Sequence, residues 1–289
     1  MLIHGVGWDS SYWDFVVGDD ETFSYVRASA DAGISTFAFD RLGTGLSEKP
    51  DPYAVVQAAT DLAIARQLGV MLRNGSITSQ GHNFTKVIGV GHSYGSIQVE
   101  ALTAIAPNLF DAVILTGFSV NATGLPVSLA GLAFKTATEV APDRFSPAQL
   151  SDGYLAPSNS YSYQWAFLHY PGFTPATVAR IQATEQPVTV GVVYTFTSLV
   201  QPAPNFAGPV HVVTGANDFI FCLANCYAVP SDSNQTSMLD FVQELYPKVT
   251  PDKFSTYIPA STGHLLNGQE SAPQTYANML AFAESVFAA

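Results

Sequence analysis

The chain has 289 residues, of which 47% are hydrophobic, so it can bury a large core in one domain that carries an inserted segment. Its 11 Lys and Arg residues against 23 Asp and Glu give a net charge of −12, which argues against nucleic acid or an anionic membrane as a partner and favours a neutral or apolar one. No uninterrupted apolar run of about 18 residues occurs, so the sequence predicts no membrane span.

The first predicted elements are strands and loops. Leu2-Ile3 is expected to end a buried strand that runs into the loop His4-Gly5-Val6-Gly7-Trp8. The apolar run over residues 34–39 predicts a parallel strand covered on both faces. In the turn-rich loop that follows it, Asp40 and Arg41 are expected to brace the loop through an ion pair or backbone hydrogen bonds rather than to act in catalysis.

A strand, a sharp turn and a helix are predicted over residues 86–100. The turn carries the pattern Gly91-His92-Ser93-Tyr94-Gly95, in which a Cβ at either glycine would collide with the neighbouring strand or helix. This geometry projects the Ser93 hydroxyl into open space, which favours a nucleophile over a buried turn serine. It also leaves the Tyr94 N–H at the helix start free to donate to an oxyanion.

The rest of the chain alternates helices with strands. Helices are predicted at residues 52–73, ended by Asn74-Gly75, at 96–106 and at 276–287, and strands at 112–115, 209–214 and 254–258. Such alternation indicates a doubly wound, mostly parallel sheet. Residues 120–205 differ, because they combine many prolines with a dense group of aromatic residues.

These motifs together resemble the α/β-hydrolase superfamily, and more narrowly the fungal secreted hydrolases of the ab-hydrolase type. The resemblance covers residues 1–119 and 206–289, the two expected parts of the core, and implies that residues 120–205 form a helical cap. The family has two or three further strands before the His-Gly strand. Because this chain begins inside that strand, the amino-terminal edge strands are expected to be missing.

The same resemblance assigns the remaining site residues. It implies that Asp218, on the loop after strand 209–214, orients His264, which acts as the base for Ser93. Asp232 and Asp240 are weaker candidates for the acid. The Val6 N–H is implied as the second oxyanion donor. The other two histidines near the turns, His4 and His92, are expected to bond backbone groups.

Substrate contacts are expected from aromatic side chains. We predict them at Trp8, Trp165 and Phe167, where they would line a pocket for an apolar acyl or alcohol group. The cap aromatics could equally form the cap's own small core.

Two features suggest a secreted protein, although no secretory signal is recognised. Glycan acceptor sequences begin at Asn74, Asn83, Asn121 and Asn234. The two cysteines, Cys222 and Cys226, would close a small disulfide loop in an oxidising compartment and would be free thiols in the cytosol. With no second ligand pair nearby, they predict no zinc site.

The combined reading is a cofactor-free serine hydrolase that cleaves a carboxylic ester or lactone of an apolar small molecule. A serine at the turn argues against the branches of the superfamily that use an aspartate nucleophile. Lyases and cofactor-free peroxidases with the same triad, and a ligand-binding pseudo-hydrolase, remain alternatives.

Overall fold

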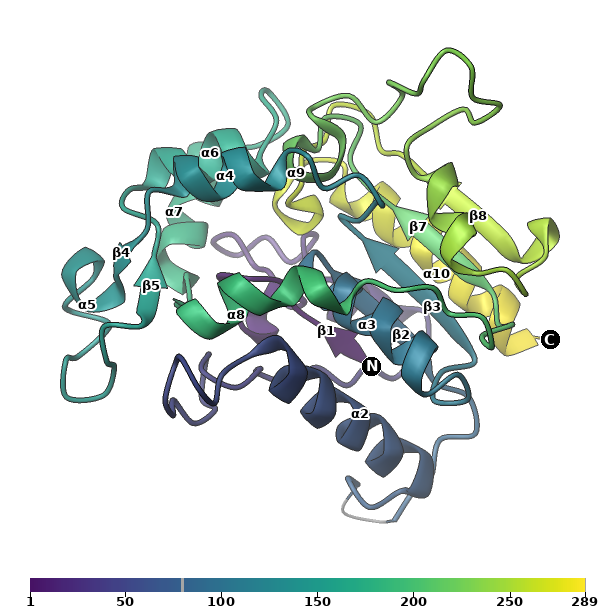
Figure 1. Cartoon of the computed structure of the whole chain (residues 1–289), viewed down its shortest axis with the longest axis horizontal. Coiled ribbons are helices and arrows are strands. Elements are labelled where there is room, and N and C mark those ends of the chain that lie inside the picture. Colours follow the sequence, from purple (N-terminus) through teal and green to yellow (C-terminus); the bar gives the residue numbers. More distant parts are fainter. Residues whose placement is uncertain (79–80, 289) are drawn as a thin grey trace.

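The computed structural model describes residues 1–78 and 81–288. A central sheet of five parallel strands runs in the order β1-β2-β3-β7-β8 (Figure 1). Its strands are β1 (Leu2–Ile3), β2 (Ile88–His92), β3 (Ala112–Thr116), β7 (Val210–Val213) and β8 (Phe254–Tyr257). Every residue of β2, β3 and β7 is buried, as expected for parallel strands covered on both faces.

Helices cover the two faces of this sheet. In Figure 1, α2 (Ala58–Asn74) and α3 (Tyr94–Ile105) lie in front of it, and α10 (Ala272–Ala288) lies behind it, packed on β7. The short α1 (Tyr25–Asp31) packs on α10. This arrangement is the predicted doubly wound sheet. No helix of the described residues is both long and apolar enough to span a bilayer.

A separate group of elements is inserted between β3 and β7. Its helices are α4 (Leu125–Leu132), α5 (Ala137–Val140), α6 (Ser160–Phe167), α7 (Pro175–Thr184) and α8 (Val190–Thr195). An antiparallel sheet of β4 (Lys135–Thr136), β5 (Tyr154–Ala156) and β6 (Val188–Thr189) accompanies them. The expected helical cap therefore also contains strands. Its boundaries stay predictions, because α8 already packs on α2 of the core.

Short helical turns complete the chain. They are α9 (Phe219–Cys222) and the 3-10 helices Ser10–Tyr12, Phe196–Leu199, Asp240–Leu245, Pro251–Lys253 and Leu266–Gly268.

Two predicted elements differ from the structure. Residues 34–39 make only one bridge, between Ala38 and Leu2, and are at least partly exposed rather than covered on both faces. They lie beside β1, at the margin of the described sheet. The helix predicted from residue 52 begins only at Ala58, after a series of turns; Gly75, in a left-handed conformation at φ 75°, ends it as expected.

A buried carboxyl group in α3 predicts how stability depends on pH. Burial raises the pKa of Glu100 from its ordinary value of 4.5 to about 8, opposed only by a bond from the Gln201 N–H. Folding therefore favours the protonated form. Its contribution to stability is complete below pH 4.5 and is lost as pH rises through about 8. Each pKa unit is worth about 1.4 kcal/mol, so the total loss is several kcal/mol.

We expect Glu100→Gln to flatten the pH dependence of the urea midpoint between pH 5 and pH 9. The matched control is Glu284→Gln, at an exposed position on α10, which should retain the wild-type slope. A Glu100→Gln variant with the wild-type slope would show that this carboxyl group does not titrate between those limits.

Candidate active site

The turn between β2 and α3 holds Ser93 in a conformation that few residues adopt. Its φ is 55° and its ψ is −120°, and its N–H donates to the Thr116 carbonyl at 2.9 Å. A Cβ on Gly95 would overlap the Ile3 carbonyl, so close packing of α3 on β1 requires glycine there. Ser93 is partly exposed, while its neighbours in β2 and α3 are buried. The turn thus presents one hydroxyl group at the carboxyl end of β2.

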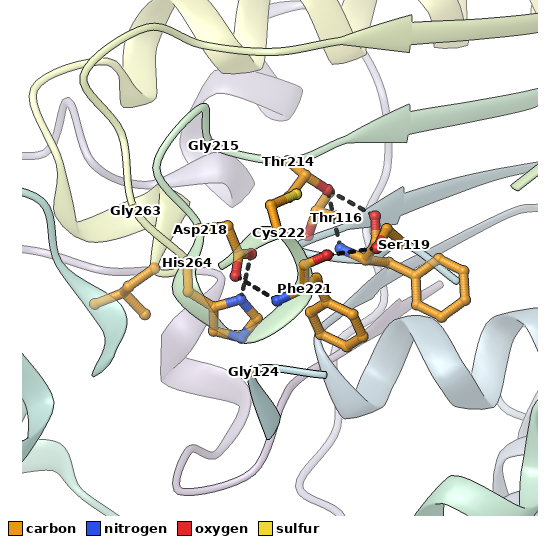
Figure 2. Close-up of polar contacts among 12 residues, drawn as sticks. Thr116, Ser119, Gly124, Thr214, Gly215, Asp218, Phe221, Cys222, Gly263 and His264 are labelled. Carbon is orange, nitrogen blue, oxygen red and sulfur yellow. Dashed lines mark hydrogen bonds and ion pairs between the residues drawn. The ribbon is translucent and has the colours of Figure 1, made fainter. Parts of the chain in front are cut away.

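His264 and Asp218 meet at the same end of the sheet, from loops that follow β8 and β7 (Figure 2). His264 Nδ1 lies 2.7 Å from Asp218 Oδ2, and both side chains are fully buried. A carboxylate at this position holds the ring with its proton on Nδ1, which leaves Nε2 able to accept one. Of the three candidate acids, Asp218 is the one that contacts His264, whereas Asp240 accepts bonds from Thr236 and Ser237.

The loop that carries Asp218 is fixed by several bonds (Figure 2). Asp218 Oδ1 accepts from the Phe221 N–H at 3.0 Å and so caps α9, while the Ser119 hydroxyl donates to the Phe221 carbonyl at 2.7 Å. Cys222 and Cys226 form a disulfide at the end of α9. The free-thiol alternative is therefore not the state of this structure.

Aromatic rings surround the imidazole of His264. The rings of His92, Phe167 and Phe221 have their centroids 4.9, 5.5 and 5.8 Å from its own. Its Nε2 is buried and has no hydrogen-bond partner among the described residues, Ser93 included. Catalytic hydrogen bonds are often unformed without substrate, so this unused acceptor remains available for a proton.

The two proposed oxyanion donors lie beside Ser93. Val6 and Tyr94 line the same cavity as Ser93, and neither backbone N–H has a partner within the described part of the chain. Tyr94 begins α3, so the positive end of the helix dipole adds to the attraction for a negative oxygen.

The loop after residues 34–39 is braced as predicted, by backbone hydrogen bonds at Asp40 and by an ion pair at Arg41. Asp40 accepts from the backbone N–H groups of Ser10 and Leu46, at 2.9 and 2.8 Å. Arg41 instead pairs with Asp61 of α2, with 2.8 Å between Nη1 and Oδ2.

Of the two histidines predicted to bond backbone groups, only His4 does so exclusively. His4 bonds only backbone groups, as expected. His92 does not: its Nδ1 lies 3.1 Å from the Thr116 hydroxyl, and its ring stacks on Tyr12 at 4.4 Å. Burial lowers the pKa of His92 well below its ordinary range, and the adjacent His264 lowers it further. His92 is therefore neutral and does not compete with His264 for a proton.

A small apolar cavity opens above Ser93. Its volume is about 40 Å³, and its walls come from the core, from α4, α6 and α8, and from the turn after α8. The lining residues are Val6, Ser93, Tyr94, Ile97, Leu125, Ser128, Leu129, Leu132, Phe167, Val193, Phe196, Ile220 and Phe221. The Ser128 hydroxyl is already used, since it donates to the Gly124 carbonyl at 2.9 Å. The cavity therefore suits an apolar group.

Only one of the three predicted aromatic contacts lines this cavity. Phe167 does. Trp165 packs outside it against Phe219 and Gly131 and is 43% exposed. Trp8 is buried among Tyr12, Tyr163 and Phe167, and it belongs to the core. Sequence could not place these rings, because their positions depend on how the inserted segment folds back.

Sequence reasoning missed the polar contacts that tie the inserted segment to the Gly7 loop. Within the inserted segment, the Tyr163 hydroxyl donates to Glu185 Oε1 at 2.9 Å, and burial raises the pKa of Glu185 to about 7. The next residue, Gln186, donates its N–H to the Gly7 carbonyl at 2.9 Å and its side chain to Asp9 at the same distance. No local pattern predicts the two contacts of Gln186, which join residues about 180 positions apart.

Asp61 was also missed, although a signal existed. It falls between Ala58, Leu62 and Ala65 on the buried face of α2, where a carboxylate needs a partner. The residues that the structure describes contain no group of three or more His, Cys, Asp or Glu side chains that could hold a metal ion.

Solved structures with a similar fold have varied activities. A protein provisionally named a non-heme bromoperoxidase, from Mycobacterium tuberculosis H37Rv, has a TM-score of 0.66 at 18% identity, covering 99% of this chain and 91% of its own. A monoacylglycerol lipase from Paleococcus ferrophilus has 0.61 at 15%, covering 99% and 93%. A methylesterase from Arabidopsis has 0.59 at 15%, covering 98% and 97%.

Likeness at such low identity establishes the fold and leaves the activity open. No curated protein sequence matches the chain. A family model described as the alpha/beta hydrolase family matches residues 1–279, which is nearly the whole chain. Together with the five-stranded parallel sheet and the turn that carries Ser93, this match shows that the chain belongs to the alpha/beta hydrolase family.

Proposed function

We propose that this protein is a serine hydrolase that cleaves carboxylic esters of small apolar molecules through an acyl-enzyme. The observation that carries the proposal is the buried Asp218–His264 pair, placed at the end of the sheet where the turn presents Ser93. A surface histidine would not need a buried carboxylate on Nδ1 with an unpartnered Nε2. Esterases and a lipase among the structurally similar proteins are consistent with this chemistry.

The reaction follows from the roles of these groups. Ser93 Oγ attacks the ester carbonyl carbon while its proton passes to His264 Nε2, and Asp218 stabilises the resulting imidazolium. The N–H groups of Val6 and Tyr94 hold the negative carbonyl oxygen. When the tetrahedral intermediate collapses, His264 returns the proton to the departing alcohol oxygen. Water then attacks the acyl carbonyl carbon and passes a proton to His264 Nε2. When this second intermediate collapses, the bond from the carbonyl carbon to Ser93 Oγ breaks, His264 returns the proton to Ser93 Oγ, and the acid leaves.

The volume of the cavity above Ser93 favours substrates with short acyl chains. On the same measure of volume, one water molecule needs roughly 10–15 Å³. A cavity of about 40 Å³ thus holds about three water-sized groups. Acetyl to butyryl chains fit this space, whereas longer chains require the wall to move.

We expect p-nitrophenyl acetate and butyrate to be hydrolysed at least 10-fold more efficiently, as kcat/KM, than the octanoate and decanoate. Longer chains must displace packed side chains of the cavity wall, and forcing extra methylenes into a packed core typically costs about 1–3 kcal/mol. Leu132→Ala, which removes a buried side chain from the cavity wall, should move the optimum to longer chains. The test is a series of initial rates across chain lengths.

The matched control for Leu132→Ala is Leu150→Ala. Leu150 is a comparably buried leucine of the inserted segment, in a separate small core away from the cavity. It should leave the chain-length profile unchanged. A wild-type enzyme that turns over no ester of the series would count against ester hydrolysis itself.

Secretion and glycosylation are further parts of the proposal. The asparagine of each glycan acceptor sequence is exposed or partly exposed, so each could carry a glycan without disrupting the core. Kinship with fungal secreted members is proposed on the motifs alone.

A further inference from the structure

Two side chains, those of Arg41 and His4, contact the carbonyl oxygen of the peptide group between Gly5 and Val6. Its carbonyl oxygen accepts from Arg41 Nη2 at 3.0 Å and lies 3.0 Å from His4 Nδ1. The N–H of the same peptide group belongs to Val6, which lines the cavity beside Ser93. Because the peptide is planar and trans, fixing the direction of its C=O also fixes the direction of its N–H. The two bonds also polarise the peptide, which strengthens the N–H as a donor.

Arg41 is itself fixed by a fully buried set of contacts. Its Nη1 lies 2.8 Å from Asp61 Oδ2, and the Tyr94 hydroxyl donates to the same oxygen at 3.0 Å. The Arg41 guanidinium also stacks over the Tyr94 ring, 4.7 Å from its centroid. One ion pair therefore supports both groups that would hold the oxyanion. It bonds the carbonyl of the peptide group whose N–H belongs to Val6, and it contacts the side chain of Tyr94.

His4 supports the same peptide as a neutral ring. Burial lowers its pKa well below the ordinary range, and the Arg41 charge lowers it further. Its Nε2 accepts from the Arg41 backbone N–H at 3.1 Å, so its proton sits on Nδ1 and is donated to the Gly5 carbonyl. This tautomer follows from the bond on Nε2.

We propose that Arg41, held by Asp61, is a positioning residue that aims the Val6 N–H at the oxyanion. A contribution to stability explains this buried ion pair less well than an orienting role does, since replacing buried ion pairs with apolar residues is often neutral or stabilising. Here Arg41 Nε and Asp61 Oδ1 are buried without partners among the described residues, which adds to the cost of burial. An orienting role explains why charged groups occupy this site. The inference rests on the proposed function, because it needs an oxyanion to form at Ser93.

The test compares Arg41→Met with Arg73→Met in the full chain. Arg73 is a matched control at the opposite end of β2: it pairs with Asp111 at 2.7 Å and donates to the carbonyls of Leu109 and Thr85. For Arg41→Met we expect kcat on p-nitrophenyl acetate to fall about 10- to 100-fold, somewhat less than for deletion of an oxyanion donor, with KM changed less than 3-fold. Arg73→Met should retain the wild-type kcat per folded molecule, measured alongside circular dichroism and Tm.

Arg41→Lys and Asp61→Asn make the test independent of how well Arg41→Met folds. Lysine keeps the charge but cannot reach both Asp61 and the Gly5 carbonyl with a planar fork, so kcat should be only partly restored. Asp61→Asn should lower kcat without raising KM, because Arg41 loses the charge that anchors it.

Two results would overturn the assignment. One is a kcat for Arg41→Met or Asp61→Asn equal to that of Arg73→Met; the other is a loss confined to KM. Failure of the proposed function looks different, since the wild-type protein would then lack Ser93-dependent turnover. Activity that requires Ser93 but is indifferent to Arg41 and Asp61 would remove this inference alone.

Discussion

Replacing Ser93 with alanine should reduce kcat for p-nitrophenyl acetate by about 10⁶-fold, to a residual rate that comes from the oxyanion site and binding alone. The loss is expected in kcat rather than in KM, because alanine leaves the cavity walls intact and removes only the attacking atom. Ser93 has little packing role, since its side chain is partly exposed at the turn. The variant should therefore have a wild-type Tm.

The matched control is Ser96→Ala, three residues further along α3. The Ser96 hydroxyl is buried and donates to the Thr116 carbonyl at 2.8 Å, so its loss should lower stability by about 1 kcal/mol while the folded enzyme keeps its kcat. A fluorophosphonate probe should label wild-type protein at Ser93 and leave Ser93→Ala unlabelled. Equal turnover by wild type and Ser93→Ala would remove the nucleophile assignment. A probe that fails to label the wild type would instead favour a ligand-binding protein without activated serine.

Asp218→Asn should lower kcat by about 10⁴-fold while the protein remains folded. Asparagine can still accept the Phe221 N–H bond that caps α9, so the loop geometry is retained. Its amide would, however, donate to His264 Nδ1 instead of accepting from it. The imidazole would then carry its proton on Nε2 and could no longer take the proton of Ser93. The measurement is kcat for p-nitrophenyl acetate, taken at a high enzyme concentration so that the slow rate can be detected.

Asp240→Asn controls for the loss of a carboxylate nearby in sequence. Asp240 also accepts backbone N–H bonds, from Thr236 and Ser237, but it makes no hydrogen bond to His264. Its replacement should change kcat less than 2-fold. If Asp218→Asn cost less than 10-fold, the buried pair with His264 would be structural, and the acid of the reaction would have to be another group.

Local patterns in the sequence were enough to predict the strands and the turn that bring these residues together. The strands β2, β3 and β7 are buried along their whole length because both faces of a parallel sheet are covered, and their mostly apolar sequences predict this without knowledge of neighbouring strands. The turn at Ser93 was also predictable, since its flanking glycines indicate positions where a Cβ would collide with the backbone of α3 or β1. Residues 34–39 failed for the converse reason: their apolar composition matches a covered strand, but the margin of the sheet leaves them partly exposed.

By itself, the sequence determined the order and type of the core elements, the α/β class and the position of Ser93, because each depends on contacts within a few residues. Only the tertiary structure decided which carboxylate meets His264, which aromatic rings line the cavity and that Arg41 pairs with Asp61 behind the Gly5 carbonyl. These contacts join residues that are distant along the chain. Their geometry is set by the packing of whole elements, which no local pattern of residues encodes.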